Sequence, residues 1–200
     1  MTKPTLIVMA KAPVIGGGKT RLAREIGAAE AWRINRGLHA HTLRLARDER
    51  WRTMLCVSPR VALDVQLPGV WPRNLPRALQ CAGDLGARLA AAMAPHRFVA
   101  VIGSDCPMID RRHIAAAFTA LRRAPFALGP THDGGFWLLA ARKGRDAARA
   151  MSDVRWSSQY AARDVLSNLA PRTVARLPTL RDIDVLEDLQ AVRAQRSARR

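Results

Sequence analysis

The sequence predicts an α/β protein whose sheet is largely parallel and covered by helices on both faces. Short apolar runs alternate with segments of helical periodicity along the 200 residues, a pattern typical of parallel strands joined by helical crossovers. Apolar residues make up 48% of the chain, enough to build the core of one α/β domain. No apolar run approaches the roughly 20 residues that a membrane-spanning helix needs.

The predicted elements follow one another with few gaps. We expect strands at residues 6–10, 53–57, 97–102, 125–128, 136–141 and 172–177. We expect helices at residues 21–27, 28–50, 84–93, 111–122, 157–169 and 185–193. The segment 61–76 contains several prolines and is predicted to be irregular. The interpretation is a single domain over residues 1–194, followed by a basic flexible tail at residues 195–200.

The formal net charge of +17 indicates attraction to anionic ligands. Nearly all of the 33 basic residues are arginines, and they are spread over the surfaces of predicted helices. They form no long block interleaved with aromatic residues, so nucleic acid is not the expected partner. We therefore expect small anionic ligands.

The cysteines and the first apolar run indicate the cellular compartment. Cys56, Cys81 and Cys106 lie far apart and form no C-x-x-C pair, so we expect buried, reduced thiols and no zinc site. The first apolar run is too short for the core of a signal peptide, which predicts a cytoplasmic protein without membrane contact. The sequence gives no indication of the oligomeric state.

A glycine-rich loop follows the first predicted strand. The stretch from Lys11 to Leu22 reads Lys-Ala-Pro-Val-Ile-Gly-Gly-Gly-Lys-Thr-Arg-Leu. Glycines let backbone N–H groups approach an anion closely, and the start of the following helix adds partial positive charge. With Lys11, Lys19 and Arg21 around Gly16, Gly17 and Gly18, the favoured ligand is a phosphate chain.

Two familiar phosphate-binding motifs fit this loop poorly. Gly18-Lys19-Thr20 resembles the end of a Walker loop, but Pro13 stands where that motif has its first glycine. The three consecutive glycines also differ from the G-x-G-x-x-G dinucleotide fingerprint. A flexible loop that binds nothing is the remaining alternative, because many glycine loops have no ligand.

Acidic residues follow two predicted elements. Asp105 comes just after the strand at 97–102, where ligands of parallel sheets bind, and Mg²⁺ takes one or two carboxylates. The alternative is an aspartate that turns the chain. Asp182 and Asp184 lie two apart on an extended segment and point the same way, so either could reach the metal. Asp184 also fits a capping box with Glu187, and both interpretations stay open.

Two polar glycine turns complete the set of candidates. Gln80 could recognise a base edge, with the Gly83 backbone letting the base approach, whereas Asp84 fits the cap of the next helix. The turn Asp133-Gly134-Gly135 could face an acceptor, but Asp-Gly is also ordinary hairpin sequence. The neighbouring His132 has no visible partner.

Together these segments resemble one family. The chain is similar to the bacterial GT-A-type, nucleotide-diphospho-sugar-transferase-like proteins, often labelled glycosyltransferase-like, and to their relative 2-phospho-lactate guanylyltransferase. The matching segments are Met9 to Pro13, Lys19 to Leu22, Gln80, Gly83 to Gly86, Gly103 to Pro107, Gly129-Pro130, Asp133 to Phe136, Trp156 to Ser158, Asp182 to Asp184 and Glu187 to Leu189. The chain departs from the family pattern at Ile15, Gly17-Gly18 and Leu186.

The resemblance implies a Rossmann-like three-layer α/β/α sandwich with a mixed, mainly parallel sheet of about seven strands, the GT-A fold. It also implies roles for the candidate residues. The first loop surrounds the triphosphate, with Gln80 and Gly83 at the base, Asp105 and Asp184 on Mg²⁺ (or Mn²⁺), and an acceptor side at Asp133, Gly134, Gly135 and Trp156. The nucleotide-binding set is then Ala10, Lys11, Gly16, Gly17, Gly18, Gln80, Gly83 and Asp84.

The function expected from these residues is Mg²⁺-dependent nucleotidyl transfer from a nucleoside triphosphate to a small phosphorylated acceptor. Lys19 and Arg21 would stabilise the pyrophosphate leaving group, and Asp105 would hold the metal. Two alternatives remain. The first is a glycosyltransferase that uses a nucleotide sugar, and the second is a non-catalytic module that binds a nucleotide or polyanion.

Overall fold

The strands form one mixed sheet, seen in a computed structural model that describes residues 3–198. Within these residues the order is β3-β2-β1-β4-β6-β5-β7. The strands are β1 (Thr5–Lys11), β2 (Arg52–Ser58), β3 (Arg77–Leu79), β4 (Arg97–Ile102), β5 (Phe126–Pro130), β6 (Phe136–Lys143) and β7 (Val174–Arg176). Only β6 runs antiparallel to its neighbours, β4 and β5. The mixed, mainly parallel sheet that the sequence analysis predicted is therefore confirmed.

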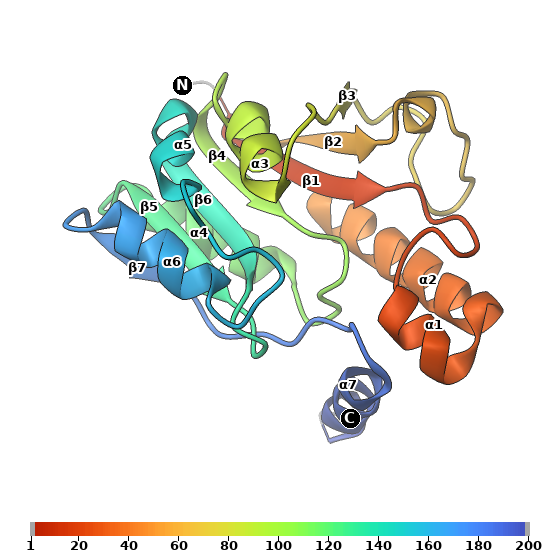
Figure 1. The fold of residues 1–200 in the computed structure, drawn as a ribbon. Coiled ribbons are helices and arrows are strands. Elements are labelled where there is room, and N and C mark those ends of the chain that lie inside the picture. Colours follow the sequence, from red (N-terminus) through yellow and green to blue (C-terminus); the bar gives the residue numbers. More distant parts are fainter. Residues whose placement is uncertain (1–2, 199–200) are drawn as a thin grey trace.

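Helices cover both faces of this sheet (Figure 1). Helices α2 (Ala28–Ala46) and α4 (Arg111–Ala120) pack on one face. Helices α3 (Leu85–Met93), α5 (Ala147–Ala150) and α6 (Ala161–Leu169) pack on the other. Helix α7 (Leu186–Ser197) lies beside α1 (Thr20–Ile26), and both form a separate small core with α2. Single 3-10 turns occur at Arg60–Leu63 and Gly144–Asp146.

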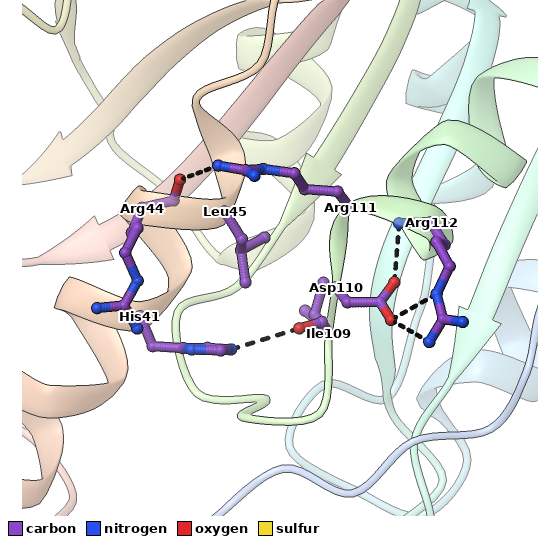
Figure 2. Close-up of a pocket in the computed structure, with 7 residues that line it drawn as sticks. All are labelled: His41, Arg44, Leu45, Ile109, Asp110, Arg111 and Arg112. Atoms are coloured by element: carbon purple, nitrogen blue, oxygen red, sulfur yellow. Dashed lines mark hydrogen bonds and ion pairs between the residues drawn. The ribbon is translucent and has the colours of Figure 1, made fainter.

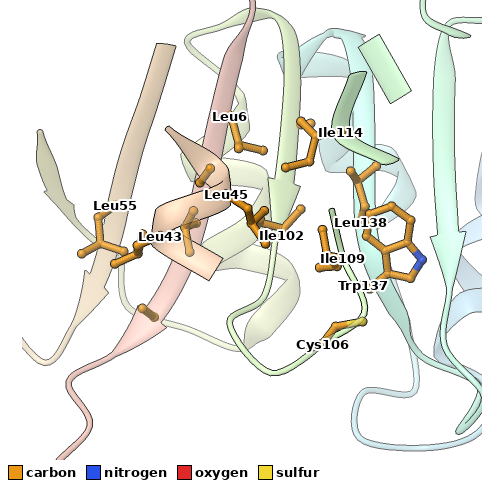
Figure 3. Close-up of a cluster of buried hydrophobic side chains, with 14 of the residues drawn as sticks. Leu6, Leu43, Leu45, Leu55, Ile102, Cys106, Ile109, Ile114, Trp137 and Leu138 are labelled. Carbon is orange, nitrogen blue, oxygen red and sulfur yellow. The ribbon is translucent and has the colours of Figure 1, made fainter. Parts of the chain in front are cut away.

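The cores follow from the alternation of side chains along buried strands. In β4, Val99 and Val101 face α3, α5 and α6, whereas Ala100 and Ile102 face α2 and α4. Successive strand residues point to opposite faces, so the continuous apolar run from Phe98 to Ile102 supplies both cores. Figure 3 shows the core on the face that α2 and α4 cover. Ile102 lies in it, close to Leu45 of α2 and to Ile109.

Several boundaries differ from the sequence predictions. The helix predicted at 28–50 ends at Ala46, because Arg47 is extended and the Asp48 carboxylate accepts a hydrogen bond from the backbone N–H of Arg50. The helix predicted at 157–169 begins at Ala161, since Ser157 has a φ of 59°. The short elements β3 and α5 were not predicted.

The predictions for the cysteines and for the C-terminal tail are also modified. All three cysteines are free, but Cys81 is exposed rather than buried, because it lies in the loop between β3 and α3. Helix α7 continues to Ser197, so it includes the start of the predicted basic tail, and residues 199–200 of that tail lie outside the described residues. Within residues 3–198, no helix is both long and apolar enough to cross a bilayer.

Candidate functional site

Three carboxylates gather at the edge of the sheet where β1 and β4 end. Among the described residues, Asp105, Asp182 and Asp184 each offer an oxygen, and these oxygens lie within 4.8 Å of one another. Asp105 follows β4, and the other two precede α7. Both aspartates of the pair approach Asp105, as their two-residue spacing predicted. This group could hold a metal ion.

Backbone and thiol contacts join the two segments that carry these acids. The N–H of Ile183 donates to the carbonyl oxygen of Asp105 over 3.1 Å. The thiol of Cys106 donates to the carbonyl oxygen of Arg181 over 3.3 Å. Gly103 leaves room for the Asp105 side chain. A Cβ atom at residue 103 would lie only 2.7 Å from Asp105 Oδ1, so a larger residue there would displace the carboxylate. The sequence Gly-Ser-Asp-Cys-Pro thus provides the space and the anchors that orient Asp105.

Lys19 connects the glycine loop to this acidic group. Its Nζ lies 2.8 Å from Asp184 Oδ1 and 3.4 Å from Asp105 Oδ2. The Lys19 side chain is 8% exposed, whereas each carboxylate is 42% exposed. Lys19 precedes α1 with a left-handed backbone (φ 52°, ψ 42°), an uncommon conformation for a residue with a side chain. Such conformations persist where surrounding contacts fix them, and here the two ion pairs supply those contacts.

The charges in this group shift one another's pKa values. Burial would lower the pKa of Lys19, but Asp105 and Asp184 raise it above its ordinary value. Burial would raise the pKa of Asp105, but the Lys19 ammonium keeps it below its ordinary value. Burial, together with the charges of Asp105, Asp133 and Asp184, raises the pKa of Asp182 to about 7. The group therefore combines the Lys19 ammonium and the ionised Asp105 with one carboxyl, that of Asp182, which titrates near neutrality.

This arrangement predicts how Asp182→Asn changes stability. Because the pKa of Asp182 is raised on folding, its contribution to stability is present at low pH and is lost as the pH rises from about 4 to 7. Asparagine resembles the protonated acid at any pH. In metal-free buffer we expect the variant to melt a few degrees above wild type at pH 8 and at the same temperature as wild type at pH 3.5. For a chain of this size, a change of about 1 kcal/mol in the free energy of unfolding shifts Tm by about 2–4 °C.

Thermal melts of both proteins across this pH range measure the effect. Asp64→Asn, at an exposed aspartate outside the group, is the matched control and should show no such dependence. A constant difference between Asp182→Asn and wild type at all pH values would contradict the prediction.

The glycine loop presents its tip to solvent. Val14 and Ile15 are 54% and 63% exposed, and Gly16 has a φ of 74°. The indole N–H of Trp32 donates to the Pro13 carbonyl over 2.7 Å, which fixes the base of the loop against α2. Lys11 and Arg21 are also exposed on either side of the loop. The loop is thus held at its base and open at its tip.

Gln80 lies where β1 and β2 end. Its Nε2 donates to the carbonyl oxygens of Ala10 at 3.3 Å and Cys56 at 2.9 Å. Both hydrogens of the amide are thereby used, and Oε1 remains as its acceptor. Gly83 has a φ of 107°, and Asp84 accepts a hydrogen bond from the N–H of Ala87 at 2.8 Å. Asp84 therefore caps α3, which confirms that interpretation.

The turn Asp133-Gly134-Gly135 joins the antiparallel strands β5 and β6. Asp133 Oδ1 accepts hydrogen bonds from the Thr131 hydroxyl and from the Gly135 N–H, so the turn has the predicted hairpin role. Gly134 has a φ of 87°, and a Cβ atom there would collide with the Gln159 carbonyl oxygen. This contact brings the turn against the segment that carries Trp156.

Trp156 packs between two elements of the same face. Its ring meets Phe136 edge-on, with centroids 6.2 Å apart, and lies 3.0 Å from the position of a Gly86 Cβ. Its buried Nε1 is the one such side-chain atom without a hydrogen-bond partner among the described residues. A side chain at residue 86 would displace this ring.

The start of α7 differs from the predicted capping box. The acceptor is the Asp188 carboxylate, which binds the N–H groups of Asp184 at 3.0 Å and Val185 at 3.2 Å. Glu25 of α1 accepts the next N–H, from Leu186. The Asp184 side chain instead faces Lys19. The capping box was therefore wrong, because Asp188 lies one helical turn beyond Asp184 and reaches back to it.

A separate pocket of about 400 Å³ lies between α2 and the start of α4 (Figure 2). The Asp110 carboxylate accepts hydrogen bonds from the Arg112 backbone and guanidinium, and Arg111 donates to the Arg44 carbonyl. The lining residues are His41, Arg44, Leu45, Ile109, Asp110, Arg111 and Arg112. None of the predicted site residues is among them.

The sequence analysis missed His39, which contacts the residue next to Asp105. His39 of α2 is buried and bonded to both Trp71 and Ser104, the residue before Asp105. These three positions are far apart in the sequence, and no local pattern links them.

Comparison with known protein families places residues 42–158 in the family described as "Uncharacterized protein conserved in bacteria (DUF2064)". The chain belongs to the DUF2064 family. The matched stretch includes Gln80, Asp105, Asp133 and Trp156 of this DUF2064 protein. Comparison with curated protein sequences finds no match.

Solved structures share the fold of the DUF2064 protein. One is provisionally named a nucleotide-diphospho-sugar transferase, from Desulfovibrio desulfuricans G20, with 25% identity and a TM-score of 0.87 over 96% of this chain and 87% of that one. A second is CMP:2-keto-3-deoxy-manno-octonic acid synthetase complexed with CTP, at 13% identity and a TM-score of 0.61 over all of both chains. A third is Rv0371c of Mycobacterium tuberculosis H37Rv in complex with manganese, at 15% identity and a TM-score of 0.50 over 96% and 98%. The resemblance to nucleotide-diphospho-sugar-transferase-like proteins is thereby confirmed at the level of fold.

Proposed function

We propose that the protein is a metal-dependent nucleotidyltransferase that transfers a nucleoside monophosphate to a small phosphorylated acceptor and releases pyrophosphate. The observation that carries the proposal is the contact of Lys19, from the glycine loop, with Asp105 and Asp184. This contact joins a phosphate-binding type of loop to a group of three carboxylates. A nucleoside triphosphate with its counter-ion needs both features in one place.

The three acids suit a hard cation. Mg²⁺ and Mn²⁺ prefer oxygen ligands, and one or two carboxylates with water and substrate phosphates complete the usual shell. Asp105 and Asp184 are the proposed ligands, and Asp182 joins them when it is ionised. When bound, the ion would supply positive charge to the phosphates. Manganese and CTP in two structures of the same fold are consistent with this.

The proposed reaction requires little acid–base chemistry. An oxygen of the acceptor phosphate attacks the α-phosphorus, and the bond from that phosphorus to the β-phosphate oxygen breaks. Because a phosphate acceptor is already anionic at neutral pH, no general base is needed. Lys19 and the exposed Arg21 are proposed to stabilise the negative charge that develops on pyrophosphate. Ala10, Lys11 and Gly16 to Gly18 would surround the triphosphate.

The base and the acceptor are proposed to lie on opposite sides of the carboxylates. Gln80, with only Oε1 unused, would accept a hydrogen bond from a base, and Gly83 would let that base approach. The Asp84 side chain already caps α3, so its contribution would come through the backbone. Asp133, Gly134, Gly135 and Trp156 would form the acceptor side, where Asp133 is close enough to raise the pKa of Asp182.

Glycosyl transfer from a nucleotide sugar is the second candidate function. It is favoured by the high TM-score to the Desulfovibrio protein, whose provisional name assigns it a nucleotide-diphospho-sugar substrate. The same loop and carboxylates would then hold a diphosphate leaving group. The third candidate is a binding module without catalysis.

One set of experiments separates these functions. Thermal shift with the four nucleoside triphosphates and common nucleotide sugars, each with and without Mg²⁺, identifies the donor. We expect a metal-dependent rise in Tm with one triphosphate. Incubation of that donor with phosphorylated acceptors should then release pyrophosphate. Release of a nucleoside diphosphate from a nucleotide sugar would favour glycosyl transfer, and binding that survives chelation without any product would favour a binding module.

A further inference from the structure

We propose that His39 is a positioning residue that fixes the loop carrying Asp105, through a hydrogen-bond chain from Trp71 to Ser104. The inference rests on the proposed metal-dependent function and extends it to residues outside the carboxylate group. His39 belongs to α2 and is 3% exposed. Its Nδ1 lies 3.1 Å from Trp71 Nε1, and its Nε2 lies 3.1 Å from Ser104 Oγ.

The direction of this chain follows from the donor capacity of tryptophan. An indole N–H can only donate, so His39 Nδ1 must accept and carries no proton. The neutral ring therefore has its proton on Nε2 and donates it to Ser104 Oγ. Burial lowers the pKa of His39 to about 4, which keeps the ring neutral at pH 7. His39 is thus the tautomer with its proton on Nε2, and Ser104 Oγ accepts a hydrogen bond from this residue of α2.

Ser104 directly precedes Asp105, and the loop is held at three consecutive residues. Ser104 is bonded to α2 through His39, whereas Asp105 and Cys106 are bonded to the segment 181–183. The bonds to segment 181–183 set the acids relative to one another. The His39 bond sets the loop relative to α2, against which the glycine loop also packs through Trp32. His39 thereby links the position of Asp105 to that of Lys19.

Loss of this bond should loosen the metal site without removing a ligand. Partners that orient metal ligands typically change metal affinity by about 10- to 100-fold when replaced. We expect His39→Leu to weaken Mn²⁺ binding by that factor, measured by electron paramagnetic resonance of free Mn²⁺ on protein shown to be folded by circular dichroism. His39→Gln keeps an N–H donor for Ser104 and should restore affinity to within about fivefold of wild type.

Three further variants separate positioning from general stability. Ser104→Ala removes only the acceptor and should weaken Mn²⁺ binding as His39→Leu does, even if the latter folds poorly. The double variant should bind no more weakly than either single one, because both changes break the same bond. His96→Leu, just before β4 and at the opposite edge of the sheet, is the matched control and should bind Mn²⁺ like wild type.

The outcomes are distinct for the two proposals. Wild-type Mn²⁺ affinity in folded His39→Leu or in Ser104→Ala would overturn the role of His39. So would His39→Gln binding as weakly as His39→Leu, since the donor would then not matter. If wild type itself binds no Mn²⁺, the metal site of the proposed function fails, whatever the variants do.

Discussion

Asp105→Ala is expected to reduce pyrophosphate release by at least about 100-fold and to leave the fold intact. Asp105 is proposed to hold the metal, and metal charge on the phosphates contributes several kcal/mol to such reactions, with about 1.4 kcal/mol for each factor of ten. The fold should persist because Lys19 keeps its shorter contact with Asp184. Initial rates with the donor found by thermal shift, together with Mn²⁺ binding, measure the effect.

The matched control for this variant is Asp64→Ala. Asp64 is exposed at the end of the short 3-10 turn and takes no part in the carboxylate group. It should retain wild-type rates and Mn²⁺ affinity. Full activity of Asp105→Ala, with normal melting behaviour, would show that the carboxylate group is not the reaction centre.

Lys19→Met is expected to change metal binding and catalysis in opposite directions. In the metal-free protein, the Lys19 ammonium lies against the same carboxylate oxygens that a cation would approach. Two like charges about 4 Å apart repel by about 4 kcal/mol at an effective dielectric constant near 20, and solvent reduces this where the acids are exposed. Without the ammonium, Mn²⁺ should bind at least about tenfold more tightly when no nucleotide is present.

Turnover should fall by about 100- to 1,000-fold in the same variant, because a cation positioned on the leaving group is lost. Mn²⁺ titration and steady-state rates on one protein preparation give both quantities. Lys143→Met removes an exposed lysine at the opposite edge of the sheet and should change neither. Weaker metal binding by Lys19→Met would contradict the competition that the geometry indicates.

Much of the fold could be predicted because its strands are buried on both faces. β4 is apolar from Phe98 to Ile102, and its ends agree with the prediction. β3 was missed because it has only three residues and follows two prolines, so it depends on pairing with β2 rather than on its own pattern. The early end of α2 depends on the side-chain bond between Asp48 and Arg50, which a periodicity analysis does not detect.

The candidate site could be predicted only where one segment contains its own signal. A carboxylate after a buried strand identified Asp105, and alternate spacing identified Asp182 and Asp184 together. The raised pKa of Asp182 depends on its burial and on the charges of Asp105 and Asp133, which lie far from it in the sequence, as well as on that of the neighbouring Asp184. The role of Asp188 at α7 and the bonds of His39 likewise need the folded arrangement.

The contact between Lys19 and Asp184 spans 165 positions of the chain. Lys19 directly precedes α1, Asp184 precedes α7, and the two helices share a small core with α2. A ligand that engages both residues therefore closes a chain loop that includes most of the protein, and it stabilises only molecules in which both ends are folded. Local unfolding of α1 or α7 would release such a ligand, so binding of the proposed substrate would be thermodynamically linked to the opening of these two helices.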